Sequence, residues 1–246
     1  VWRRGSRNRL VLQGVSVPYV LVGMVPRPAR GYRNAARRIL HRNATGCAMH
    51  EAMATEATRL DRRLRARDLD TLPHEWDTRY ELAGGVLFMS TRPSMVHQRT
   101  IARLIVALHA PVTAVGGIVV PEPGLVREED GDDSVAPDVA VVLADRLAIV
   151  DTKLRGAPNL IIEVLSPGPE ARRRDHEAKR ELYFRRGVLE YWMIDPEARA
   201  MLRLTRGESD WIEEQLDEAA VVRTPLLSHW DGTTVMNLLP PRPNAG

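Results

Sequence analysis

Two acidic residues lie in sequence runs that are expected to be buried strands, where a carboxylate requires a compensating partner. Glu163 lies in Leu160–Leu165, where the other five residues are aliphatic. This run predicts a strand buried on both faces, and an unpaired carboxylate there would be strongly destabilising. Asp138 follows Pro137 at the start of a second strand-like run, residues 137–143. Carboxylates on two neighbouring strands would form an oxygen-rich site for a hard divalent cation such as Mg²⁺, which would compensate the charge of Glu163.

A third candidate, Lys179, lies on a predicted charged helix over residues 170–186. A helical wheel at about 100° per residue places Lys179 on the same face as Asp175, Ala178 and Leu182, with Tyr183 on the flank of that face. The opposite face carries Arg173, Glu177, Arg180 and Glu181. Lys179 is therefore expected to face the sheet rather than solvent.

Each of these residues also has a simpler interpretation. Glu163 could lie on an edge strand with its carboxylate in water, although the aliphatic residues at both alternations argue against this. Asp138 after Pro137 could form an Asx turn or a cap. Asp175 and Lys179 could be an i,i+4 helix pair, worth about 0.2–0.5 kcal/mol. Residue types and spacing alone leave the last two alternatives open.

Apolar spacing predicts the elements that would position these residues. Two short apolar runs around Gly84-Gly85 predict a β-hairpin over residues 80–89. Apolar residues at 101, 104, 105 and 108 predict an amphipathic helix over 96–108, and Gly187 is placed to end the helix over 170–186. Other expected elements are a helix over 49–69, strands over 116–120, 124–127, 189–194, 199–204, 210–214 and 219–223, and a solvated acidic loop over 128–133. This order predicts a mixed α/β domain.

The charge of the chain is unevenly distributed. Of 246 residues, the first 48 contain ten arginines and no lysine or acidic residue, whereas the remainder carries 25 basic and 32 acidic residues, a net charge of −7. The overall charge of +3 is therefore poor evidence that the folded body binds nucleic acid. The basic segment could be a nucleic-acid-binding arm, a transit peptide or sequence upstream of the true start. We favour the last, because the chain begins with Val1 and Met49 precedes the first helical pattern.

These patterns predict three parts of the chain. Residues 1–48 are expected to be a basic extension that is disordered or wrongly assigned, residues 49–232 the domain, and residues 233–246 a C-terminal tail. The lone cysteine, Cys47, excludes an internal disulfide and a multi-cysteine metal site, and it fits the reducing cytoplasm. The apolar stretch 15–25 is too short to span a bilayer, so no membrane partner is expected.

A series of short sequence blocks runs from about residue 72 to 213: Tyr80-Glu81-Leu82 with Gly85, Met89-Ser90, His97, Pro137-Asp138, Pro158 with Leu160–Pro167, Asp175 with Lys179 and Tyr183, Gly187-Val188, Glu190-Tyr191-Trp192 and Asp195-Pro196. In their order and spacing these blocks resemble the Uma2 family of restriction endonuclease-like proteins. The resemblance implies the PD-(D/E)xK nuclease fold, a mixed sheet flanked by helices. The chain departs from the family pattern at Gly84, where the family usually has Asp, and at Thr91, where the family usually has Pro.

The resemblance also implies roles for individual residues. Asp138 and Glu163 would bind Mg²⁺, or Mn²⁺ in its place, and Lys179 would assist the attacking water. In the wider nuclease superfamily the lysine stands two residues after the glutamate, a position occupied here by Leu165, whereas the Uma2-like pattern has its lysine on the following helix. Further members of the implied site are Glu81 and His97, with Asp175 and Tyr183 in support.

The expected activity is Mg²⁺-dependent endonucleolytic hydrolysis of phosphodiester bonds in nucleic acid, with DNA as the expected substrate. The alternative is a catalytically inactive binding or assembly module with the same fold. The acidic body makes this alternative serious, because a DNA-cleaving protein normally presents a basic face. That face could be local, or a homodimer could supply it.

Overall fold

The structure is a computed structural model that describes residues 3–5, 9–12, 15–22, 64–72, 78–90, 92–126, 131–166 and 174–242, with the backbone alone for 3–22 and 174–176. Most of the helix expected over 49–69 lies outside these ranges; residues Ala66–Thr71 form a 3₁₀ helix, η1. No described helix is long and apolar enough to cross a membrane.

The central element is a six-stranded mixed sheet with the strand order β11-β10-β9-β8-β7-β6. Strands β8 and β9 are parallel, and every other neighbouring pair in this sheet is antiparallel. Its strands are β6 (Ile118–Pro121), β7 (Val139–Val142), β8 (Leu160–Val164), β9 (Glu190–Asp195), β10 (Ala200–Arg206) and β11 (Trp211–Leu216). Because β8 lies between β7 and β9, the edge-strand interpretation of Glu163 is wrong.

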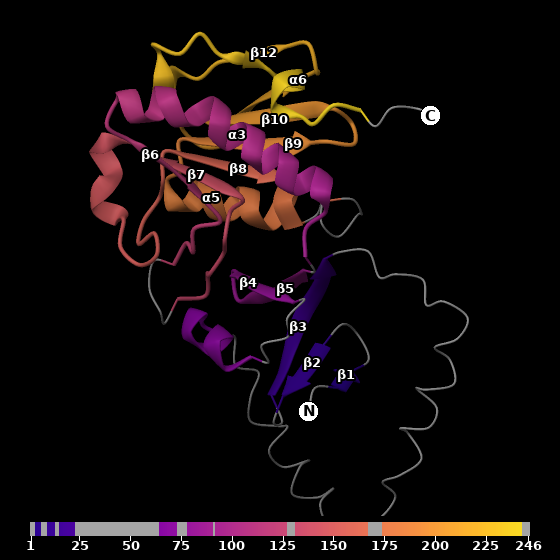
Figure 1. Cartoon of the computed structure of the whole chain (residues 1–246). Coiled ribbons are helices and arrows are strands. Elements are labelled where there is room, and N and C mark those ends of the chain that lie inside the picture. Colours follow the sequence, from indigo (N-terminus) through magenta and orange to yellow (C-terminus); the bar gives the residue numbers. More distant parts are fainter. Residues whose placement is uncertain are drawn as a thin grey trace, which may run out of the picture.

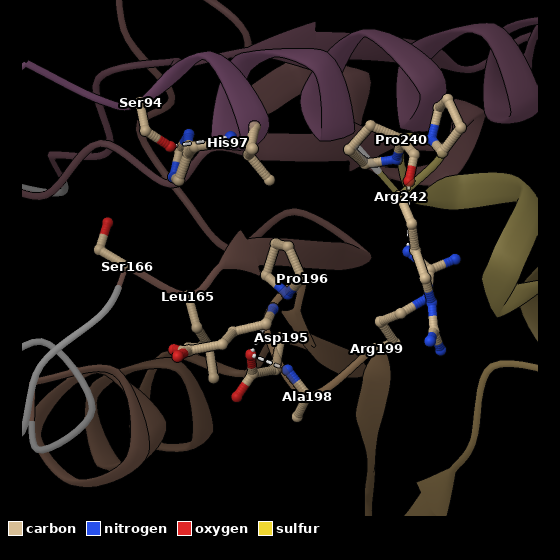
Figure 2. A pocket seen from close by; sticks show the side chains of 13 residues that line it. Ser94, His97, Leu165, Ser166, Asp195, Pro196, Ala198, Arg199, Pro240 and Arg242 are labelled. Carbon is tan, nitrogen blue, oxygen red and sulfur yellow. Dashed lines mark hydrogen bonds between the residues drawn. The ribbon is translucent and has the colours of Figure 1, made fainter. Parts of the chain in front are cut away.

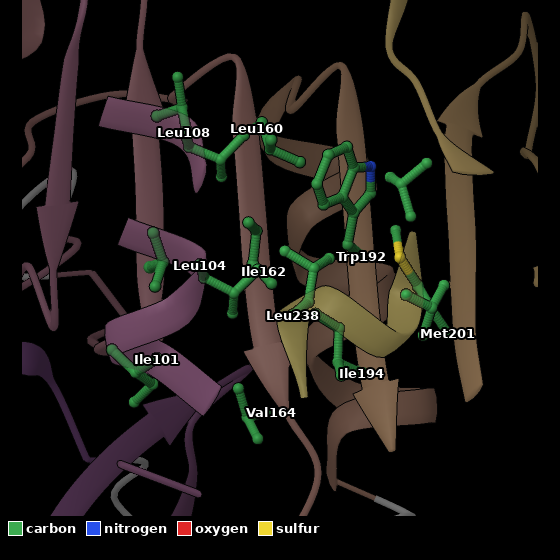
Figure 3. Packing of buried hydrophobic residues seen from close by; sticks show 14 of the residues in the cluster. Ile101, Leu104, Leu108, Leu160, Ile162, Val164, Trp192, Ile194, Met201 and Leu238 are labelled. Atoms are coloured by element: carbon green, nitrogen blue, oxygen red, sulfur yellow. The ribbon is translucent and has the colours of Figure 1, made fainter. Parts of the chain in front are cut away.

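Helices cover both faces of this sheet (Figure 1). Helix α3 (Met95–Ala114) and the short α6 (Val235–Leu238) lie on one face, and α5 (Arg180–Arg186) lies on the other. Along β8, Ile162 packs on the α3 side with Leu104 and Trp192, as Figure 3 shows. Ile161 packs on the α5 side with Tyr183. This mixed sheet flanked by helices confirms the predicted fold class.

Strand β4 (Arg79–Ala83) and strand β5 (Val86–Ser90) form the predicted hairpin. Its turn residues, Gly84 and Gly85, have φ values of 58° and 76°, the left-handed conformation that a two-residue type I′ turn requires. The chain before β7 runs beside this hairpin, because Leu82 and Ser134 exchange two backbone hydrogen bonds of 2.7 Å. The hairpin is thereby connected to the start of β7, where Asp138 lies.

The segment preceding α5 is not a regular α-helix. Residues Arg174–Lys179 form a wider π-helical segment, η3, which continues into α5. Gly187 ends α5 with φ 91°, as predicted for a glycine C-cap. Despite the change in pitch, Lys179 and Leu182 are both 2% exposed, so the predicted sheet-facing orientation of Lys179 is confirmed.

Both ends of the chain depart from the expected boundaries. Within the basic segment 1–48, the described residues form strands β1 (Arg3–Gly5), β2 (Arg9–Leu12) and β3 (Val15–Val22), and β3 pairs in parallel with β5. Residues 233–239 were expected in a tail, but they form β13 (Thr233–Thr234) and α6. There Val235, Leu238 and Leu239 are buried in the core, because their apolar side chains pack against α3 and the sheet, on the face that α3 covers. The early start site stays a prediction.

The weaker strand predictions have mixed outcomes. Those over 199–204 and 210–214 correspond to β10 and β11, and the one over 219–223 shortens to β12 (Val221–Val222), which pairs with β13. No strand forms over 124–126; Leu125 makes only isolated bridges to Val135 and Leu154. The described short 3₁₀ helices η2 (Ala144–Ile149) and η4 (Pro225–Leu227) connect the remaining elements.

A buried acid, Glu190, opens β9. Its Oε1 accepts a 2.8 Å hydrogen bond from the Thr224 hydroxyl, and its Oε2 accepts one of 2.8 Å from the indole N–H of Trp192. Burial raises the pKa of Glu190 above its ordinary value, while these two hydrogen bonds and the charge of Arg203 oppose that rise. The folded state therefore favours the protonated carboxyl.

The raised pKa of Glu190 predicts a pH-dependent contribution to stability. The contribution is fully present below the unfolded-state pKa of about 4.3 and is lost as pH rises through the folded-state pKa. Glu190→Gln stays neutral and can still bind both partners, so its stability should decline less than that of the wild type from about pH 4 to pH 7. Urea unfolding across this range measures the difference, and parallel stability profiles would contradict the assignment.

Candidate active site

Glu163 lies in a buried polar cluster on the α5 side of the sheet. Its Oε1 accepts a 2.9 Å hydrogen bond from Lys179 Nζ and one of 2.7 Å from the Tyr183 hydroxyl. Glu163 is 2% exposed and Tyr183 is fully buried. The carboxylate at the centre of the aliphatic strand is therefore compensated by an ammonium group of the following helix.

Lys179 also binds a carboxylate from the hairpin. Its Nζ lies 3.0 Å from Glu81 Oε1, and that oxygen accepts a 2.9 Å hydrogen bond from the Ala136 backbone N–H. Glu81 on β4 and Lys179 before α5 are far apart in the sequence, and the pairing of β4 with the segment before β7 brings them together. One ammonium thus connects β4, β8 and the helix.

Asp138 joins this cluster from the start of β7. Its Oδ2 accepts a 2.7 Å hydrogen bond from the backbone N–H of Val164, the residue after Glu163, and lies 3.2 Å from His97 Nε2. His97 is positioned by the start of α3, where Ser94 caps the helix and accepts the His97 backbone N–H at 3.2 Å. The carboxylate of Asp138 is therefore fixed between α3 and β8. An isolated Asx turn would bind only the backbone next to Asp138, so it does not account for these contacts.

The surroundings shift the pKa of two groups in this site. Burial alone would raise the pKa of Asp138, but the hydrogen bond and charge of His97, the charge of Lys179 and the Val164 N–H together hold it below the ordinary value. Burial raises the pKa of the Tyr183 phenol far above its ordinary value, and the neighbouring Glu163 carboxylate adds to this effect. Asp138 is therefore an anion and Tyr183 a neutral hydrogen-bond donor near neutral pH.

The donor set fits a magnesium ion. Asp138 and Glu163 supply carboxylate oxygens from adjacent strands, and Mg²⁺ is commonly held by one or two carboxylates with water and substrate completing its octahedron. With all three acids ionised, the carboxylates of Glu81, Asp138 and Glu163 outnumber the cationic groups that contact them, and a divalent cation would compensate the remaining negative charge. Within the described ranges no group of three His, Cys, Asp or Glu side chains forms a ready-made metal cage.

The structure brings together five of the residues named from the sequence: Glu81, His97, Asp138, Glu163 and Lys179. Tyr183, expected in a supporting position, donates to Glu163 directly. The side chain of Asp175 lies outside the described part of the chain, so its role stays a prediction. Leu165 is buried at 8% exposure and carries no charge into the site.

Sequence reasoning missed Asp133, which it assigned to a solvated loop. Asp133 is 4% exposed, and its Oδ1 accepts a 2.7 Å hydrogen bond from the backbone N–H of Gly84. Its carboxylate also binds the guanidinium groups of Arg185 and Arg186 on α5. Asp133 therefore connects the hairpin that carries Glu81 to the helix that follows Lys179. No residue pattern in the acidic run 128–133 signals this burial.

Asp133→Asn should loosen this connection without touching the carboxylates of the site. The amide can still accept from Gly84 N–H, but the charge-assisted hydrogen bonds from Arg185 and Arg186 weaken, at a cost of about 1–3 kcal/mol. The Ala136 amide, which binds Glu81, should then exchange its hydrogen faster by about tenfold or more. NMR hydrogen exchange measures this rate.

Glu213→Gln is the matched control, because Glu213 forms a 2.5 Å ion pair with Arg180 that connects the same helix to β11. This pair is more exposed and is expected to contribute about 0.2–1 kcal/mol. Exchange at Ala136 should be unchanged in the control. Equal protection of Ala136 in the two variants would rule out a positioning role for Asp133.

A mixed sheet with helices on both faces and acidic residues on its neighbouring central strands defines a nuclease-like fold. Residues 66–235 match the Uma2 family model, described as "Putative restriction endonuclease". The match covers more than half of the chain, and the protein belongs to this family. Family membership supports a nuclease, a hydrolase whose substrate is nucleic acid.

Solved structures give an independent comparison. The fold is similar to that of a protein from Anabaena variabilis ATCC 29413 described as "a putative nuclease belonging to DUF820", with a TM-score of 0.59 and 18% sequence identity. The similarity covers 71% of this chain and 97% of the other. At this identity it shows the fold alone. A comparison with curated proteins found no match.

Proposed function

We propose that the protein is a Mg²⁺-dependent endonuclease that hydrolyses phosphodiester bonds of DNA. The observation that carries this proposal is the meeting of Asp138, Glu163 and Lys179 at adjacent central strands, with Glu81 and His97 in contact with them. Family membership supports the nuclease class. The donor set supports the choice of metal, and the family resemblance supports the choice of DNA.

Asp138 and Glu163 would hold the ion in this mechanism. When bound, Mg²⁺ lowers the pKa of a water molecule and polarises a phosphoryl oxygen. The contact from His97 and the Val164 N–H fix the orientation of Asp138, as outer contacts of metal ligands commonly do. A bound cation would thus meet carboxylates that the protein already holds in position.

Lys179 has the geometry of an orienting cation. Its ammonium group is fixed by Glu81 and Glu163, so a nucleophilic water or a phosphate oxygen beside it would meet a preorganised positive charge. Tyr183 keeps Glu163 in position because its hydroxyl donates a hydrogen bond to the same carboxylate oxygen that Lys179 binds. Leu165, at the position where the wider superfamily has lysine, leaves this role to Lys179.

Incubation with supercoiled plasmid DNA tests the proposal. Nicked and linear products should form with Mg²⁺ and disappear when EDTA removes the metal, and RNA of matched sequence should be cut more slowly. Metal binding without cleavage of plasmid DNA, of single-stranded DNA of the same sequence or of the RNA would reject the nuclease and favour a binding module. The net charge of −7 outside residues 1–48 is the observation that makes this second function worth testing.

A further inference from the structure

A cavity of about 680 Å³ opens beside the candidate active site (Figure 2). Its walls are the start of α3, the chain just after β8, the turn between β9 and β10, and the segment after α6. The volume lies within the range of small-molecule pockets, about 300–1,000 Å³. It can therefore admit a unit of the size of a nucleoside.

The cavity and the catalytic cluster share a side chain. His97 lines the cavity and contacts Asp138 through Nε2, while its Nδ1 is buried and has no hydrogen-bond partner among the described residues. Leu165, another lining residue, directly follows Val164, whose N–H binds Asp138. A molecule in the cavity would thus lie next to the carboxylate that is expected to bind the metal.

The lining is chemically mixed. Four charged side chains contribute to it, and the two acids, Asp195 and Glu197, balance the two bases, Arg199 and Arg242. Most of the exposed lining surface is apolar and includes proline rings and the side chain of Val96. A phosphate group would require an excess of positive charge, whereas a neutral heterocycle with both donors and acceptors matches apolar walls with polar groups of both signs.

The wall formed by the segment after α6 is held in a defined position. Arg199 donates to the Pro240 carbonyl at 3.2 Å and forms an ion pair with Glu218. Arg242 contacts Glu218 at 3.2 Å. Pro240 and Arg242 lie beyond residues 66–235, so this wall is a feature of the chain outside the range that the family model matches.

We propose that the cavity receives one unstacked nucleobase of the substrate, from the nucleotide next to the phosphodiester at Asp138 and Glu163. This inference rests on the proposed nuclease function. A base inside a duplex cannot enter such a cavity without leaving its stack. The substrate class is therefore single-stranded nucleic acid, or a duplex that is unpaired at the cleavage position.

Val96→Trp tests the proposal by filling the cavity. Val96 is 45% exposed, so a larger side chain can be accommodated at this position on α3. Val106→Trp is the matched control, since Val106 is 79% exposed on the same helix and does not line the cavity. Arg242→Ala is a second cavity variant, and with a side chain 71% exposed it should not disturb folding.

The probes are a phosphorothioate single strand and its duplex, both labelled with fluorescein, in the presence of Mg²⁺. Val96→Trp should weaken binding of the single strand by about tenfold or more, as expected for the loss of a base-sized contact. Arg242→Ala should also weaken it, and Val106→Trp should bind as the wild type does. Tighter binding of the duplex by the wild type, or unchanged binding by Val96→Trp, would overturn the proposal.

A titration with the neutral nucleoside cytidine separates this inference from the nuclease proposal. NMR shift changes around the cavity should appear in the wild type and in Val106→Trp, but not in Val96→Trp, whether or not the protein cuts plasmid DNA. Cytidine binding without cleavage would retain the base pocket and reject the nuclease. Cleavage of plasmid DNA with no cytidine shifts would reject the base pocket alone.

Discussion

Replacing Lys179 with methionine is expected to lower the free energy of unfolding by about 3–5 kcal/mol. Lys179 is 2% exposed, and its Nζ lies 2.9 Å from Glu163 and 3.0 Å from Glu81. Methionine fills a similar volume, so the loss comes from charge rather than from a cavity. Two buried carboxylates would share the site without their cation, and removing one partner of a buried pair leaves an uncompensated charge.

The pH and metal dependence of Lys179→Met distinguish this cause from a general packing defect. The deficit should be largest near pH 8 and smaller near pH 5, because uptake of a proton by one carboxylate removes part of the repulsion. Millimolar Mg²⁺ should restore part of the stability, since a cation then compensates the acids again. Urea unfolding at both pH values, with and without Mg²⁺, measures these effects.

Lys153→Met is the control for this prediction. Lys153 is the only other lysine in the chain and lies half-buried on the loop before β8. Its replacement should change the stability by less than about 1 kcal/mol, with no response to Mg²⁺. A Lys179→Met protein as stable as Lys153→Met would show that Glu81 and Glu163 do not depend on this ammonium.

The central strands and the orientation of Lys179 were predictable because local pattern determines them. The aliphatic run around Glu163 indicates a strand covered on both faces, and β8 lies between two neighbours. The helical wheel identified the buried face of the helix even though residues Arg174–Lys179 are π-helical. Lys179 is the last residue of that segment, and Leu182 and Tyr183 lie in the regular helix α5, so the wheel's angles between them hold. Family resemblance, rather than spacing, joined these residues to Glu81 and His97.

Contacts between distant segments left no signal of this kind. Asp133 belongs to an acidic run with the composition of a solvated loop, and its burial depends on two arginines about fifty residues later. The core role of Leu238 and Leu239 was hidden by the prolines that follow them. In both cases the burial of the side chain depends on the surface that distant parts of the fold place against it. The periodicity of the local sequence carries no information about that surface.

Asp138→Asn is expected to reduce Mg²⁺-dependent hydrolysis by about 10³-fold or more, because a metal ligand and several kcal/mol of charge stabilisation are lost together. The amide keeps an oxygen that can accept the Val164 N–H, so the fold at the end of β8 should persist. Stability without metal should therefore change little, whereas the Mg²⁺-induced rise in melting temperature should disappear. Initial rates of plasmid nicking and thermal unfolding measure the two effects.

Asp145→Asn provides the matched control. Asp145 is also an acid near the central sheet, where it accepts a hydrogen bond from the Asn159 side chain, but it lies in η2, away from the site. It should retain both the nicking rate and the Mg²⁺-induced stabilisation. If Asp138→Asn kept its response to Mg²⁺ while losing activity, the ion would not depend on Asp138, and the role of this residue would be restricted to orienting His97 through their 3.2 Å contact. Because the two measurements separate metal binding from catalysis, they decide between a metal ligand at the start of β7 and a positioning residue.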